Sequence, residues 1–224
     1  MEAQAGSTVI RVLIVDDHPL VAEGVEAVLG RESDIQVVGV ASTALEAEEI
    51  SRREAPNVVL MDLRLPDRSG AEAAAAIRAE QPEVAVVFLT ADASDDAIGR
   101  AVQAGAVGFL LKGDAAGEIP RAVRRAAAGE MLIPADVLAR LFVVQGRNAL
   151  TQAERAKVVA QFTRRERDVL NLMGEGIDNG GIAERLFVEL TTVRWHVRNI
   201  LEKLDVHSKL AAVLRASEFG LIER

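Results

Sequence analysis

The chain has 224 residues, of which half are hydrophobic, so it is long enough for one large domain or two of ordinary size. It contains no cysteine and only 3% aromatic residues, which excludes disulfides and thiolate metal sites and argues against RNA or single-strand binders that stack bases. The net charge of -8 is uneven, with 12 Lys and Arg against 22 Asp and Glu in residues 1–130 but ten of each in residues 163–224, so we expect two units with different partners.

The first half of the chain alternates short apolar runs with helical patterns. Each run is rich in β-branched residues and too short for a buried helix, so it predicts a buried strand. The predicted strands are 9–15, 35–40, 58–61, 84–89 and 108–111. The predicted helices that follow them are 20–29, 44–53, 69–80, 95–104 and 114–129. Five strand–helix pairs in strict alternation indicate an α/β fold with a parallel sheet covered on both faces.

The pattern changes after Gly129, where no further strand is predicted. We interpret residues 130–161 as a partly helical linker, with helical patterns at 135–144 and 152–162. Beyond it the sequence predicts four helices at 164–173, 181–187, 191–204 and 208–219. About four residues separate the second of these helices from the third, which is typical of a helix-turn-helix whose second helix enters the DNA major groove.

Polar residues close four of the five predicted strands. They are Asp16 with Asp17, Asp62, Thr90 and Lys112. Each has an ordinary explanation as a helix cap, a loop hydrogen bond or a solvated lysine. Because the carboxyl ends of parallel strands meet at one edge of the sheet, we expect these side chains to converge in one site.

Three carboxylates in such a site repel one another. Two unit charges about 4 Å apart cost about 4 kcal/mol at an effective dielectric constant near 20, so a cation is required. Oxygen ligands without His or Cys favour Mg²⁺. A metal ion, a lysine, a hydroxyl and a free carboxylate together favour phosphoryl transfer in which the carboxylate attacks.

These motifs, taken in chain order, resemble the receiver domain of two-component response regulators. The matching segments are Asp16-Asp17-His18, Met61-Asp62-Leu63-Arg64-Leu65-Pro66, Thr90-Ala91 and Gly108-Phe109-Leu110-Leu111-Lys112. The resemblance implies a flavodoxin-like, five-stranded receiver over residues 9–129.

The same resemblance assigns roles to these residues. Asp62 would accept a phosphoryl group from a histidine kinase, while Lys112 would pair with the phosphate and Thr90 would swing to bond to it. Phe109 would be the rotating switch aromatic, although it could equally be an ordinary core residue. Four groups would bind Mg²⁺, namely the carboxylates of Asp16, Asp17 and Asp62 and the backbone carbonyl of Arg64.

The third helix of the second half carries outward polar residues. Its apolar side leaves Arg194, Trp195 and Arg198 facing outward, with the two arginines one turn apart. A solvated amphipathic helix explains two arginines, but an outward tryptophan is typical of a contact surface.

Residues 162–213 resemble the DNA-binding domain of the LuxR/FixJ type, and its linkage to a receiver defines the NarL/FixJ subfamily. We therefore expect an all-α, four-helix DNA-binding domain over residues 162–224. The resemblance makes Arg194, Trp195 and Arg198 candidates for base contacts, and assigns the dimer contact to the helix at 208–219. Its candidates for phosphate contacts are Lys203, Ser208 and Lys209.

Some residues depart from that family pattern. Glu189 stands where a serine usually caps the recognition helix, and Gly180 and Gly181 stand where a charged pair is usual. The domain also has no net charge, whereas DNA-binding domains are generally basic. We expect weak monomeric DNA binding that needs dimerisation.

The expected function is that of a cytoplasmic transcriptional response regulator, not an enzyme, that is phosphorylated on Asp62 by a histidine kinase. Its expected partners are that kinase, double-stranded promoter DNA and, when active, a second copy of the chain, but no membrane. The alternative is a phosphorylation-independent adaptor whose helical domain binds protein. An aspartyl phosphatase is disfavoured because Arg64 stands where those enzymes usually carry a second Asp.

Overall fold

The computed structural model describes residues 9–90, 95–112, 117–133 and 158–222. The chain divides into two compact units, one made of Met1–Ala93 and Phe109–Ala128 and the other of Ser94–Gly108 and Gly129–Arg224. The second unit includes Ser94–Gly108, so this division does not coincide with the predicted domains. The domain boundaries at residues 129 and 162 therefore stay predictions. Most of the expected linker, including the helical patterns at 135–144 and 152–157, lies outside the described residues.

The first half forms a five-stranded sheet with the order β2-β1-β3-β4-β5. The strands are β1 Ile10–Val15, β2 Ile35–Ala41, β3 Val58–Asp62, β4 Ala85–Thr90 and β5 Gly108–Leu111. The ladders joining β1 to β2, β1 to β3 and β3 to β4 are all parallel, which confirms the predicted sheet. Every residue of β3 and β4 is buried, as their continuous apolar sequence requires.

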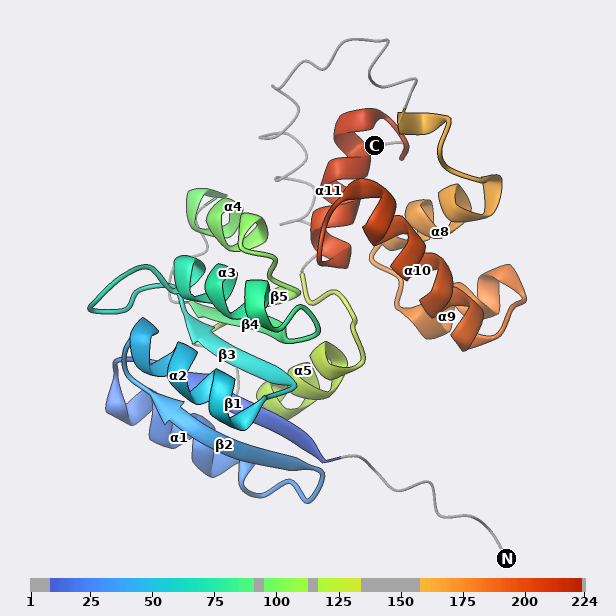
Figure 1. The fold of residues 1–224 in the computed structure, drawn as a ribbon. Coiled ribbons are helices and arrows are strands. Elements are labelled where there is room, and N and C mark those ends of the chain that lie inside the picture. Colours follow the sequence, from blue (N-terminus) through green and yellow to red (C-terminus); the bar gives the residue numbers. More distant parts are fainter. Residues whose placement is uncertain (1–8, 91–94, 113–116, 134–157, 223–224) are drawn as a thin grey trace, which may run out of the picture. The chain divides into compact units, whose positions relative to one another are not determined.

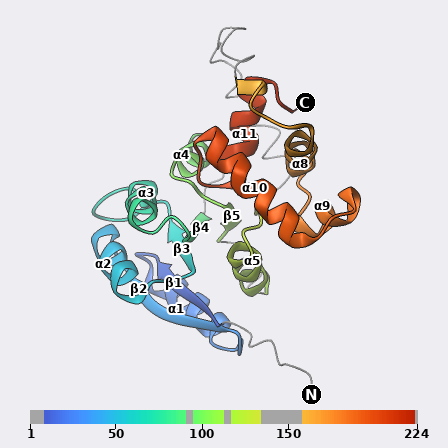
Figure 2. The same ribbon diagram turned by 45° about the vertical axis from the view of Figure 1, so that its right-hand side comes forward.

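Helices cover both faces of this sheet. Their bounds are α1 Pro19–Leu29, α2 Ala44–Glu54, α3 Gly70–Glu80, α4 Asp95–Gln103 and α5 Glu118–Ala127. α2 and α3 lie on one face and α1 and α5 on the other, as Figures 1 and 2 show. This doubly covered arrangement is the predicted α/β architecture. One pairing was not predicted, since Leu132 forms an isolated parallel bridge with Gly108.

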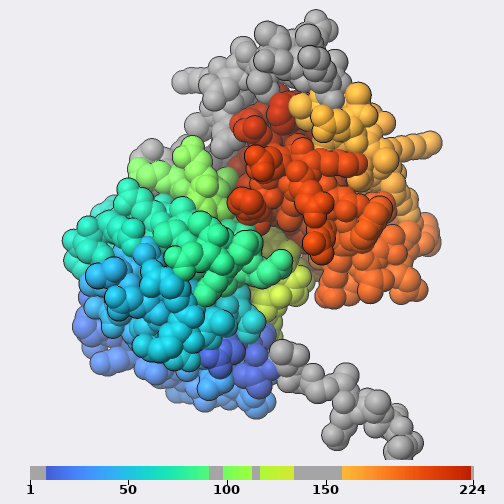
Figure 3. All heavy atoms as spheres, in the orientation of Figure 1, coloured from blue at the N-terminus to red at the C-terminus, as the bar shows by residue number. Residues whose placement is uncertain are grey.

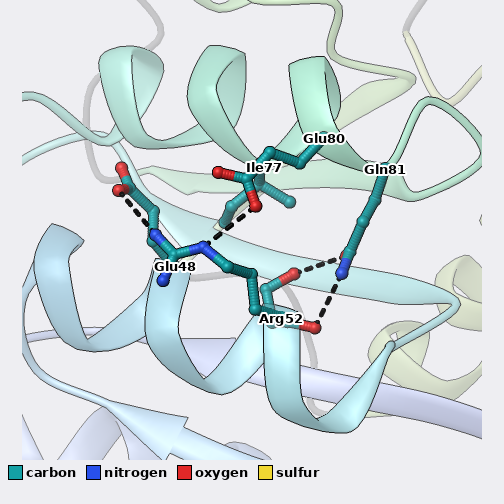
Figure 4. A pocket seen from close by; sticks show the side chains of 6 residues that line it. Glu48, Arg52, Ile77, Glu80 and Gln81 are labelled. Atoms are coloured by element: carbon teal, nitrogen blue, oxygen red, sulfur yellow. Dashed lines mark hydrogen bonds and ion pairs between the residues drawn. The ribbon is translucent and has the colours of Figure 1, made fainter.

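Polar side chains join α2 to α3 across a shallow hollow (Figure 4). Arg52 Nε lies 2.9 Å from a carboxylate oxygen of Glu80, and Ser51 Oγ lies 2.8 Å from Gln81 Oε1. Gln81 also donates its amide to the Ser51 carbonyl. In the space-filling view the surfaces of the two helices meet (Figure 3). These bonds fix the two helices on the sheet face.

The second half contains the four predicted helices. They are α8 Arg164–Gly174, α9 Asn179–Leu186, α10 Leu190–Leu204 and α11 Lys209–Phe219. α9 begins two residues before its predicted start because the Asp178 side chain caps it, accepting from Gly181 N at 2.7 Å. Gly180 and Gly181 therefore lie in the first turn. No helix within the described residues is both long and apolar enough to cross a membrane.

A buried carboxylate ties α8 to α10. Glu166 is 3% exposed and forms a capping box with Thr163, whose backbone N–H donates to Glu166 Oε2 at 2.8 Å. Lys203 Nζ lies 2.6 Å from the same oxygen. Burial raises the pKa of Glu166, but the bonds from Lys203 and Thr163 lower it by more than burial raises it. The net pKa therefore lies below its usual 4.5.

The substitution Glu166→Gln is expected to destabilise the C-terminal helices by about 1–2 kcal/mol, because it removes the charge partner of Lys203. A fully buried pair would cost about 3–5 kcal/mol, but Lys203 keeps 31% exposure and can turn to water. The difference should be fully present above pH 4.5 and should vanish as pH falls through the lower folded-state pKa. Urea titrations followed by Trp195 fluorescence measure it, since this is the only tryptophan.

The matched control is Glu202→Gln. It removes the exposed pair between Arg198 and Glu202, whose side chains are 80% and 64% exposed, and should change stability by less than about 0.5 kcal/mol. Equal urea midpoints for the two variants would contradict a structural role for the Glu166–Lys203 pair.

Candidate functional site

Two buried carboxylates close the neighbouring strands β1 and β3. Asp16 follows Val15 and Asp62 follows Met61, and Val15 and Met61 are paired in the sheet. The two Asp residues are 3% and 6% exposed. Ligand atoms of Asp16, Asp17, His18 and Asp62 all lie within 4.8 Å of one another. The structure thus brings together the three carboxylates that the sequence places at strand ends.

Lys112 supplies the positive charge at this edge. Its Nζ lies 2.7 Å from Asp16 Oδ2 and 2.5 Å from Asp62 Oδ2, and its side chain is 16% exposed. Burial lowers the pKa of Lys112, but the bonds to the two carboxylates outweigh it and the net pKa is raised. The ammonium is therefore held charged against both carboxylates.

His18 belongs to this cluster, although sequence reasoning gave it no role. Its Nδ1 lies 2.8 Å from Asp17 Oδ1 and 3.2 Å from Asp16 Oδ1. Its backbone N–H also donates to Asp16 Oδ1 at 3.0 Å. The position of His18 directly after the two aspartates in the sequence could have indicated this role. Its two bonds to Asp16 orient the Asp16 carboxylate.

The loop after Asp62 is held close to the carboxylate. The backbone N–H of Arg64 donates to Asp62 Oδ1 at 3.1 Å, and that of Gly70 donates to the Leu63 carbonyl at 3.0 Å. A Cβ atom on Gly70 would lie 1.9 Å from the Asp62 carbonyl oxygen, so only glycine fits at the start of α3. The Ser69 side chain caps α3 by accepting from Ala71 N.

Asp67 anchors the same loop to α2. Its carboxylate accepts from Ala44 N at 2.9 Å and from Leu45 N at 3.1 Å, at the N-terminus of that helix. The bond from Ala44 is the main cause of a lowered Asp67 pKa. Sequence reasoning missed this anchor because its partners lie more than 20 residues away.

Thr90 and Phe109 end up beside the same edge of the sheet. Thr90 is 4% exposed at the end of β4, where its carbonyl accepts from Lys112 N at 2.9 Å. Phe109 is half-buried and stacks on the buried Phe88, with ring centroids 6.2 Å apart. This placement is compatible with both a switch aromatic and a core residue.

α10 presents the predicted polar face. Val193, Val197, Ile200 and Leu204 are buried, while Arg194, Trp195 and Arg198 are exposed. Glu189 caps the helix without a side-chain hydrogen bond, as its departure from the usual serine implied. α10 follows α9 after Phe187, Val188 and Glu189, which is the spacing of a helix-turn-helix.

The structure gives the three candidate phosphate contacts internal partners instead. Lys203 pairs with Glu166, and Ser208 accepts from Ala211 N as the cap of α11. Lys209 is 8% exposed and donates to Asn179 Oδ1 at 2.7 Å, and burial lowers its pKa to about 8. These bonds stabilise the fold, and contacts of the three residues with phosphates stay a prediction.

Two family models match the chain. Residues 12–124 match the response regulator receiver domain, and residues 160–216 match the bacterial regulatory proteins of the luxR family. The chain is 36% identical over 214 residues to the response regulator protein VraR of Staphylococcus aureus, covering 96% of this chain and 99% of the relative. A VraR of Staphylococcus saprophyticus is 35% identical over the same length.

Solved structures agree with these matches. The signal receiver domain of the putative response regulator NarL from Mycobacterium tuberculosis is 38% identical with a TM-score of 0.53, covering 55% of this chain and 98% of that one. The RcsB response regulator of Salmonella typhimurium covers 92% of this chain and 97% of its own, with a TM-score of 0.54. At 23% identity it shows the fold alone.

The substitution Gly70→Ala is expected to destabilise the first unit by about 1–3 kcal/mol, because the new methyl group meets the Asp62 backbone. Urea unfolding followed by circular dichroism measures this loss. Gly24→Ala is the control, since no atom lies within 4 Å of the place that its methyl group would take in α1, and it should stabilise by up to about 1 kcal/mol. A Gly70→Ala chain as stable as the original would show that the loop is not tightly held.

Proposed function

The chain belongs to the response regulators that join a receiver domain to a LuxR-type DNA-binding domain, and from that premise we propose that Asp62 is its phosphoryl acceptor. It is a DNA-binding two-component response regulator, and its luxR-family match favours DNA over the adaptor alternative. The single observation that carries the proposal is the placement of Lys112 Nζ 2.5 Å from Asp62 Oδ2.

The proposed transfer uses Asp62 as the nucleophile. A carboxylate oxygen bonds to phosphorus while the P–N bond of the kinase phosphohistidine breaks, and the imidazole nitrogen leaves with the bonding pair. Lys112 neutralises the phosphoryl oxygens that arrive beside Asp62, and the Thr90 hydroxyl bonds to the product. The resulting acyl phosphate adds charge and acceptor oxygens at the edge of the sheet.

The acidic cluster fits Mg²⁺. Asp16, Asp17 and Asp62 offer carboxylate oxygens within 4.8 Å of one another, and these hard oxygen ligands suit that ion. These three side chains and the Arg64 backbone carbonyl would hold it. His18 also lies in the cluster, but its Nδ1 is directed at Asp17 and Asp16. When bound, Mg²⁺ supplies charge neutralisation to the transferring phosphoryl group.

The proposed output is DNA binding by a homodimer. Phosphorylation of Asp62 draws Thr90 toward the phosphate, and Phe109 turns inward behind it. The altered surface favours dimerisation, with α11 as the dimer contact. α10 then enters the major groove, where Arg194, Trp195 and Arg198 meet base edges.

Incubation with Mg²⁺ and acetyl phosphate is expected to add one phosphoryl group, seen by intact-mass spectrometry. Asp62→Ala should abolish this gain in mass because it removes the attacking oxygen. The control Glu72→Gln, an exposed carboxylate on α3, should be phosphorylated like the original chain. Phosphate that persists in Asp62→Ala would overturn the assignment.

DNA binding is expected to depend only moderately on salt. The phosphates that this neutral domain neutralises are few, so the slope of log K against log salt should be shallower than about -8. Arg198→Ala, which removes a proposed base contact, should weaken binding and change the slope by about 1 at most, whereas Arg121→Gln on α5 should change neither. Fluorescence anisotropy with promoter DNA measures this, and a steeper slope would contradict the proposal.

A further inference from the structure

Exposed large hydrophobic side chains in the described residues from 158 to 222 gather at the helix-turn-helix. Phe187 is 95% exposed, Leu190 is 38% exposed and Trp195 is 59% exposed. No other large hydrophobic side chain of that range is exposed. We call these three residues the apolar strip. Along the chain it runs from the turn into the first turns of α10, the part of a recognition helix that meets base edges. Around the helix Leu190 lies about 140° from Trp195 and close to the side of the buried Val197, so Trp195 is the outward member of the strip.

Packing within the domain does not explain the strip. Trp195 lies opposite the buried Val193 and Val197, and its only ring contact among the described residues is an edge contact with His196 at 4.9 Å. Phe187 ends α9 with φ of 53°, a conformation that is strained for a bulky residue. Large apolar groups held in water, one of them on strained backbone, mark a contact surface.

The lack of net positive charge in this domain favours an apolar contribution to DNA affinity. Residues 163–224 have no net charge, and several of their cations are already engaged within the fold. Lys203 bonds to the buried Glu166, and the buried Lys209 bonds to Asn179. With fewer cations left for phosphates, specific affinity must rest more on contacts with bases.

Duplex DNA offers one apolar group in its major groove, the C5-methyl of thymine. We infer that the apolar strip reads thymine methyl groups, with Trp195 as the principal contact, and so gives the operator thymines at the positions it faces. The inference rests on the proposed function, in which α10 enters the major groove. Arg194 and Arg198 are exposed on the same helix, both to one side of Trp195, and they draw this surface to the anionic duplex.

The test replaces thymine with deoxyuridine, which lacks only the methyl group. The full chain, treated with acetyl phosphate and Mg²⁺, first selects its preferred duplex from a random pool. Each thymine of that duplex is then replaced in turn and affinity is measured by anisotropy. We expect about a threefold to fivefold loss at the positions that the strip faces, the factor for burying one methyl group.

Protein variants assign the loss to the strip. Trp195→Ala should bind thymine and deoxyuridine duplexes equally at those positions, and Trp195→Phe should keep part of the discrimination. Arg198→Ala should weaken binding to both duplexes by the same factor. Leu45→Ala, which removes a 59% exposed leucine of α2, should change neither affinity. Circular dichroism verifies that each variant is folded.

The outcomes separate the inference from the proposed function. If the chain selects a duplex but binds its deoxyuridine versions equally, methyl reading is wrong and the proposed function stands. If Trp195→Ala keeps the discrimination, the assignment to Trp195 is wrong. If equal binding accompanies self-association that Trp195→Ala abolishes, the strip joins two copies of the chain instead. If no duplex is selected, the proposed function itself fails.

Discussion

Coulomb repulsion between Asp16 and Asp62 is the constraint around which the first half of the structure is built. The sheet order puts β1 beside β3, so their terminal carboxylates are buried side by side. Lys112 extends from the end of β5 to both of them, and its ammonium offsets a repulsion of several kcal/mol. The same arrangement forms the charged edge at which we propose phosphoryl transfer.

The two halves of the chain differ in how they use their charged residues. The acidic half concentrates charge at one edge of a sheet and holds it with a lysine and a histidine. The neutral half uses its cations internally, since Lys203 and Lys209 stabilise contacts between helices. The exposed face of α10 therefore combines two arginines with a tryptophan, and in the proposed recognition it depends more on bases than on phosphates.

The sequence predicted features that follow from local pattern or from sheet geometry. Strand and helix periods located the elements, and the rule for parallel strands brought Asp62 and Lys112 together. Contacts between distant residues that neither a local pattern nor the geometry of the sheet fixes could not be predicted. The anchor from Asp67 to α2 and the pair between Glu166 and Lys203 join residues far apart in the chain. Lys203 and Lys209 were named as candidate phosphate contacts, and sequence alone did not show their partners Glu166 and Asn179.

The most direct test of the central claim is the urea midpoint of Lys112→Met, measured with and without Mg²⁺. Without the ion, the variant should unfold at clearly lower urea than the original chain, because Asp16 and Asp62 then repel each other uncompensated. Saturating Mg²⁺ should restore much of the loss by linkage. A variant that matches the original chain without Mg²⁺ and does not respond to the ion would contradict the account.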